Sequence, residues 1–82
     1  MVIFEGEFSA RGHSFRCTGS YEIKHDHLHC GDAVATDERS GLRYAVADIH
    51  LPVDAGGDHE ASLLQAIRRQ LEQGAAPPPL AD

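Results

Sequence analysis

The chain has few basic residues and no long apolar run, and each shortage excludes a class of protein. Seven lysines and arginines stand against 13 aspartates and glutamates in 82 residues, which gives a formal net charge of −6. We therefore expect no binding to nucleic acid or to an anionic membrane, because both require a basic surface. No apolar run is long enough to span a bilayer.

Cysteine is also scarce, because the chain has two, too few for the disulfide framework of a small secreted domain. Residues 1–5 lack the basic region and the apolar core of a secretory signal. We therefore expect a cytoplasmic protein with free thiols. The length predicts one domain over residues 1–74, followed by a disordered proline-rich tail over residues 75–82.

Apolar and polar residues alternate over residues 2–10 and again over residues 14–24, a pattern typical of half-buried strands. A two-residue turn at residues 11–12 joins them and opposes residues whose numbers sum to 23. This register matches apolar side chains with apolar ones and an acid with a base: Phe8 with Phe15, Phe4 over Gly19, and Glu7 with Arg16.

A second turn at residues 25–26 predicts a third strand, whose alternation is interrupted at residues 31–32 and indicates a bulge. The polar loop 37–41 leads to a fourth strand over residues 42–51, where parity breaks at residues 47–48 and indicates another bulge. The second turn predicts three opposed pairs: Ile23 with Leu28, Tyr21 with Cys30, and Cys17 with Val34.

After Pro52 the apolar period changes from 2 to 3.6, which predicts a helix that begins near the N-cap Asp58 and ends before Gly74. Its predicted apolar stripe is Ala61, Leu64, Ile67 and Leu71, with Leu63 beside it. We therefore expect an α+β fold: a four-stranded antiparallel meander sheet with one C-terminal helix packed on its apolar face (ββββα).

The ββββα order and the acidic charge resemble small uncharacterised proteobacterial proteins, through the run from Phe4-Glu5-Gly6-Glu7-Phe8 to Gly41-Leu42-Arg43-Tyr44. The helix start, residues 57–61, is similar to that of small antitoxin-like domains of the HicB type. Those domains place a strand after the helix, whereas prolines 77–79 follow it here. Neither resemblance carries an activity or a catalytic residue to this chain.

The densest group of chemically reactive side chains is the histidine-rich stretch 25–29. His27 and His29 share the polar face, and the predicted register places Glu22 opposite His29, with Asp48 able to approach from the fourth strand. Histidines and carboxylates are ligands of zinc and other divalent transition metals. The candidate metal ligands are therefore His27, His29, Glu22 and Asp48. The alternatives are a solvated polar face and a pH-sensitive or partner-binding surface.

Cys17 and Cys30 are predicted to point inward without facing each other, as small buried hydrophobes. No spacing suggests a nucleophilic triad, so we expect no enzyme and no cofactor apart from the zinc hypothesis. A one-layer sheet has two open edges, which favours a non-catalytic protein–protein interaction module that is a monomer or a weak homodimer. The alternative function is binding of a divalent metal by the histidine cluster.

Overall fold

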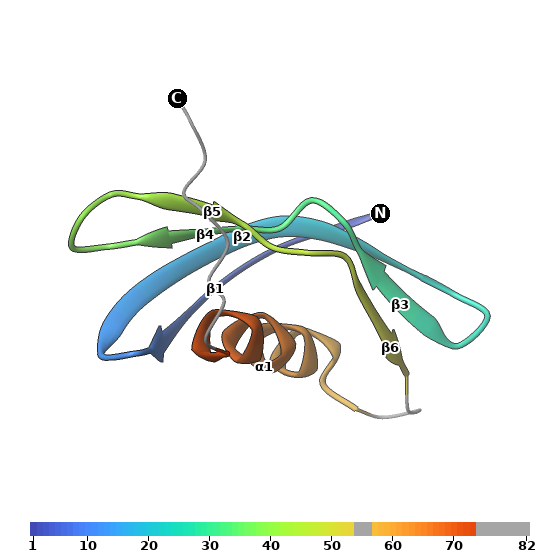
Figure 1. The fold of residues 1–82 in the computed structure, drawn as a ribbon. Coiled ribbons are helices and arrows are strands. Elements are labelled where there is room, and N and C mark those ends of the chain that lie inside the picture. Colours follow the sequence, from blue (N-terminus) through green and yellow to red (C-terminus); the bar gives the residue numbers. More distant parts are fainter. Residues whose placement is uncertain (54–56, 74–82) are drawn as a thin grey trace.

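The structure is a computed structural model that describes residues 1–53 and 57–73. Within these residues the chain forms six strands and one helix (Figure 1): β1 (Val2–Ala10), β2 (His13–Lys24), β3 (His27–Cys30), β4 (Val34–Asp37), β5 (Arg43–Ala45), β6 (Ile49–Pro52) and α1 (His59–Glu72). The helix covers one face of an antiparallel sheet, so the α+β fold is confirmed. The prediction of four strands is wrong, because the third and fourth strands are each broken into two.

The hairpin of β1 and β2 has the predicted register, with all nine pairs from Val2–Tyr21 to Ala10–His13 as expected. Both turn residues have positive φ, 54° at Arg11 and 77° at Gly12, as a type I′ turn requires. This turn matches the right-handed twist of the two strands and therefore holds the register.

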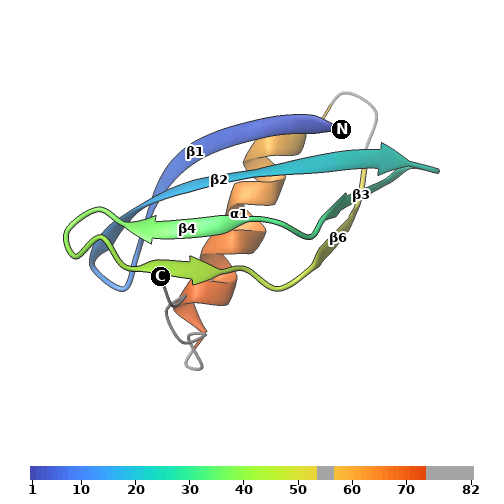
Figure 2. The same cartoon turned by 90° about the horizontal axis from the view of Figure 1, so that it is seen from above.

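Strand β2 is the centre of the sheet, with β1 along one side and both β3 and β4 along the other (Figure 2). Residues 22–24 of β2 pair with β3, and residues 15–18 pair with β4. Between them, residues 19–21 lie opposite the four residues 30–33, so one extra residue enters the ladder. The predicted bulge is confirmed. The predicted pairing of Cys17 with Val34 is wrong by this one residue.

The predicted fourth strand is interrupted beside the bulge, which divides it into β5 and β6. The offset that pairs Val34 with Ala45 also pairs His29 with His50, so the interruption at residues 46–48 leaves the register unchanged. The Val46 N–H donates to the Ala33 carbonyl over 3.0 Å and bridges the gap. The predicted interruption is confirmed, but the predicted second bulge is wrong, because residues 46–48 lie opposite an equal number of residues, 31–33.

Helix α1 begins where expected, because the Asp58 side chain accepts a hydrogen bond of 3.0 Å from the Ala61 N–H. The buried positions are Leu63, Ile67 and Leu71, spaced by four residues, whereas Ala61 is exposed. The predicted stripe is therefore wrong at Ala61, and Leu63 takes the central place. Gly74 and the tail lie outside the described residues. This 14-residue helix is too short to cross a membrane, and no other helix occurs among the described residues.

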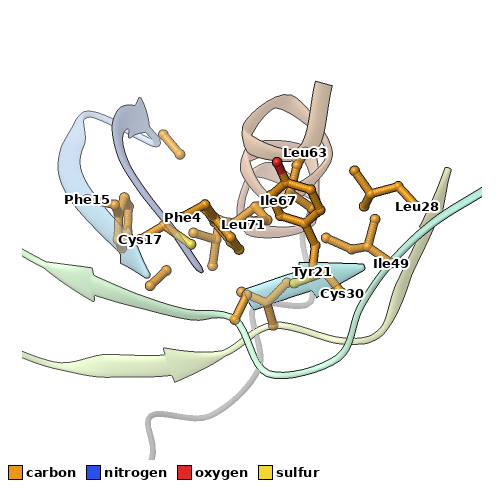
Figure 3. Packing of buried hydrophobic residues seen from close by; sticks show 14 residues of the cluster. Phe4, Phe15, Cys17, Tyr21, Leu28, Cys30, Ile49, Leu63, Ile67 and Leu71 are labelled. Carbon is orange, nitrogen blue, oxygen red and sulfur yellow. The ribbon is translucent and has the colours of Figure 1, made fainter. Parts of the chain in front are cut away.

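The core lies between α1 and the inner face of the sheet (Figure 3). Its largest members come from the helix and four strands: Phe4, Phe15, Tyr21, Leu28, Ile49, Leu63, Ile67 and Leu71. Burying one such side chain stabilises the fold by about 1.5–3 kcal/mol before the loss of conformational entropy is subtracted. These contacts press the helix onto the inner face and leave the outer face available for a site.

One carboxylate, Asp37, is buried at the end of β4. It accepts hydrogen bonds from the backbone N–H groups of Arg39 and Ser40, over 2.9 and 3.4 Å, and its other oxygen lies 2.8 Å from His13 Nδ1. These bonds, the one from Arg39 first, lower the pKa of Asp37. The carboxylate thus closes the predicted loop between β4 and β5.

Substitution of Gly19 tests how tightly the bulge packs. A Cβ on Gly19 would lie 2.9 Å from the Ala33 Cα, which is backbone and cannot turn aside, and 3.1 Å from the Phe4 ring. A Cβ on Gly6 would meet only the end of the flexible Leu64 side chain. We expect Gly19→Ala to lower the free energy of unfolding by roughly 1–3 kcal/mol, and Gly6→Ala by less. Urea denaturation measures both, and equal losses would contradict this account.

Candidate metal centre

The site lies on the outer face of the sheet, where the bulge between β3 and β4 meets the interruption between β5 and β6. The side chains of Cys30 and Ala33 are both buried, as are those of Val46 and Ile49, although each pair is three positions apart. The intervening residues 31–32 and 47–48 therefore stand out of the pleat together. Bulges redirect side chains in this way and occur often beside functional sites.

Asp32 satisfies the polar groups that the bulge leaves without a ladder partner. Its Oδ1 accepts a hydrogen bond of 2.8 Å from the Ser20 N–H, and its Oδ2 accepts one of 2.6 Å from the Ser20 hydroxyl. These bonds, led by the one from the hydroxyl, lower the pKa of Asp32. The bulge is thus fixed by a carboxylate in place of backbone pairing.

Two histidines stack across the strands next to the bulge. His29 of β3 and His50 of β6 are directly opposed, and their rings lie 4.4 Å apart at their centroids with planes 11° from parallel. Asp48 lies in the segment between β5 and β6, two residues before His50, and extends toward the same place. The imidazole nitrogens and the Asp48 carboxylate offer ligand atoms that all lie within 4.8 Å of one another. Among the described residues this is the one such group.

The Nε2 atom of His29 is the least satisfied atom of the group. It is shielded from solvent and has no hydrogen-bond partner. Its distance to Asp48 Oδ2 is 3.6 Å, which is too long for a hydrogen bond. Two ligand atoms about 2.05 Å from a tetrahedral zinc ion lie about 3.4 Å apart. The observed separation is therefore closer to that of two metal ligands than to that of a donor and an acceptor.

Gly31 leaves room beside these atoms. A Cβ at this position would lie 3.2 Å from Asp48 Oδ1 and 3.5 Å from His29 Nε2. A side chain at this position would therefore crowd both the carboxylate and the unpartnered nitrogen. An ion between these two atoms would satisfy both, and the donor set of two imidazoles and one carboxylate suits zinc and related divalent metals.

The sequence-predicted ligands are only partly brought together. His29 and Asp48 are in the group, and Glu22 lies opposite His29 in the predicted register. Glu22 and His29 line a cavity of about 140 Å³, but Glu22 is outside the close group. His27 is turned to the preceding turn, where its Nδ1 lies 3.0 Å from the His25 carbonyl oxygen.

Sequence reasoning missed His50. It alternates with the apolar residues Ile49 and Leu51, which is the signal that places its ring on the outer face. Its position opposite His29 follows only from the pairing of β3 with β6. That pairing was obscured by the parity break at residues 47–48.

The two cysteines lie on the opposite face from this site. Both are free and buried, and Cys30 points inward while its neighbour His29 points outward, which excludes a nucleophile–base pair between them. Burial, with a smaller contribution from Cys30, raises the pKa of Cys17 to about 12. Burial also raises the pKa of Cys30. Neither thiol is a candidate nucleophile in the folded chain.

Comparisons of the chain with protein-family models, with curated proteins and with solved structures find no match. The assignment of function therefore depends on the geometry of this site.

The burial of both thiols predicts their reactivity. In the folded protein at neutral pH we expect neither Cys17 nor Cys30 to react with a maleimide, and both to react in denaturant, because the thiolate is the reactive form. Intact mass spectrometry counts the added groups. Rapid labelling of either cysteine under native conditions would show that the core opens at this point.

The pKa of Asp32 predicts a dependence of stability on acid. Since the folded pKa is below its ordinary value of 3.8, the stabilisation is present above that pH and is lost as the pH falls through the lowered pKa. The difference in unfolding free energy between the natural chain and Asp32→Asn should therefore shrink as the pH falls below 3.8. Urea titrations at a series of pH values measure it, and a difference that stays constant would contradict the role assigned to the carboxylate.

Proposed function

We propose that this protein binds one divalent transition-metal ion, with zinc as the first choice, through His29 Nε2, the Asp48 carboxylate and His50. The observation that carries the proposal is the His29 Nε2 atom, which is buried without a partner. The carboxylate 3.6 Å away supports the same conclusion, as does Gly31, where any side chain would crowd both atoms.

The ligand set defines what kind of metal site this is. Two imidazoles and one carboxylate are three protein ligands, so a tetrahedral ion keeps its fourth position for water or another ligand. A similar set with open positions also holds ferrous iron, and copper binds nitrogen ligands more tightly than zinc does. Relative affinities for Zn²⁺, Fe²⁺ and Cu²⁺ therefore form part of the test. Glu22 of β2 lies directly opposite His29 and is therefore the side chain nearest in register for the fourth position.

Metal binding would also stabilise the sheet by linking separate strands. The ligands come from β3, from β6 and from the segment between β5 and β6, so one ion would join strands at the point where both ladders are interrupted. An ion present at about 100 times its dissociation constant stabilises the folded state by about 2.7 kcal/mol. In a domain of this size such a gain raises the melting temperature by about 10 °C or more.

We predict that zinc raises the melting temperature of the natural chain and shifts the NMR signals of the His29 and His50 rings at one equivalent. His50→Ala and Asp48→Asn should each lose this effect, because each removes one of three ligands. Binding should also weaken in acid, because imidazole ligands must be unprotonated to bind a metal ion. Differential scanning fluorimetry and ¹H–¹⁵N NMR of the rings measure the two effects.

His27→Ala is the matched control, because it removes a histidine from the same strand and the same face but outside the close group. It should keep the zinc response. Loss of binding in His27→Ala with retention in His50→Ala would reverse the assignment in favour of the ligands expected from sequence. The absence of selective shifts at one equivalent of any of the three metals would end the proposal. Glu22→Gln then reports whether the fourth position is held by this carboxylate.

A further inference from the structure

The outer border of β1 is a second surface that the metal site does not use. Among the described residues β1 pairs only with β2, and Figure 2 shows it along one border of the sheet. The strand has nine residues, long for an unprotected edge. A strand edge of this kind pairs with an added strand unless its side chains prevent it.

The turn determines which backbone groups face outward. A β-turn at residues 11–12 joins the Ala10 carbonyl to the His13 N–H. Antiparallel pairs then alternate between bonded and non-bonded along the hairpin. Every second residue of β1 therefore directs its N–H and C=O away from β2. These residues are Ile3, Glu5, Glu7 and Ser9.

The side chains of these four residues lie on the outer face of the sheet, and their chemical character changes along the strand. Ile3 is 81% exposed, and Met1 beside it is 92% exposed. Glu5 and Glu7 follow, both exposed. Glu5 forms an ion pair with Arg16 of β2, whereas Glu7 has no ion-pair partner among the described residues. The edge is thus apolar at its start and acidic in its middle.

A second copy of the chain fits this edge poorly. Two-fold antiparallel pairing centred on residue 5, 6 or 7 places a glutamate directly opposite a glutamate in each case. Pairing centred on residue 4 opposes Ile3 to Glu5. Like charges directly opposed across strands destabilise the pairing. The charges therefore favour a partner of opposite sign.

We propose that β1 binds, by antiparallel strand addition, an extended segment of another protein. The segment has basic side chains opposite Glu7 and Glu5 and an apolar side chain opposite Ile3. Its backbone bonds to the outward groups of residues 3, 5, 7 and 9, and its basic residues supply the charge that the edge lacks. This edge shares no residue with the proposed metal ligands, which come from β3, from β6 and from the segment between β5 and β6.

A designed peptide tests the proposal on the full chain. The probe is acetyl-Ser-Lys-Val-Arg-Val-Ile-Ser-amide, and its matched control has glutamate in place of lysine and arginine. With ¹⁵N-labelled protein we expect the basic probe to shift the amide signals of residues 3, 5, 7 and 9 at up to about 1 mM, and the acidic one not to. The shifts should decrease at about 0.5 M salt, because the exposed charges are then screened.

A substitution that reverses one charge of β1 tests the same proposal. Glu7→Lys should weaken binding of the basic probe roughly fivefold, because an attractive cross-strand pair becomes a repulsive one. Glu38→Lys makes the same change of charge in the loop between β4 and β5 and should leave binding unchanged. Equal shifts from both peptides, shifts confined to other strands, or no shift at about 1 mM would overturn the proposal. Sedimentation that shows a dimer whose formation is abolished by Glu7→Lys would also overturn it, in favour of self-association.

Discussion

The extra residue opposite β2 is the constraint on which the rest of the structure depends. Without it, a regular third strand would continue from Cys30 with Asp32 pointing into the core and Ala33 pointing out. The bulge restores the inward direction at Ala33 and turns the Asp32 carboxylate to Ser20, where it replaces the lost backbone pairing. It also increases the local twist. Figure 1 shows β3 and β6 turned away from the direction of β4 and β5.

The candidate metal centre lies beside this bulge and the matching interruption in the neighbouring strand. Gly31 lies in the bulge and Asp48 in the interruption, while His29 and His50 form the last pair but one before the ladder is interrupted. Asp48 is two residues from His50, and Gly31 is two residues from His29, so the alternation of a strand places all four on the outer face. The stacked imidazoles thus follow from the pairing of β3 with β6, and Asp48 supplies the third ligand atom beside Gly31, which has no side chain to crowd it.

Much of this fold could be predicted from the sequence, and the reasons are local. The register of β1 and β2 follows from a two-residue turn and an uninterrupted alternation, so one error would have moved every aromatic to the wrong face. The register beyond the bulge could be predicted only to within one residue. The Gly31-Asp32 sequence indicates that the alternation is interrupted, but it does not indicate which residue of β2 lies opposite. For the same reason the position of His50 opposite His29 could not be predicted. The buried stripe of α1 was predicted wrongly at Ala61, since a methyl side chain is accepted on either face of a helix.

The two edges of the sheet are protected by different means, and this difference separates the two proposed activities. Edge strand β6 has four residues and ends at Pro52, which lacks the donor that a further strand would need. Edge strand β1 is more than twice as long, contains no proline, and is guarded only by the charges of Glu5 and Glu7. A proline resists every added strand, whereas acidic side chains resist like charges and attract basic ones. Edge strand β6, which carries His50, therefore offers an added strand no donor at Pro52, whereas the acidic edge is selective.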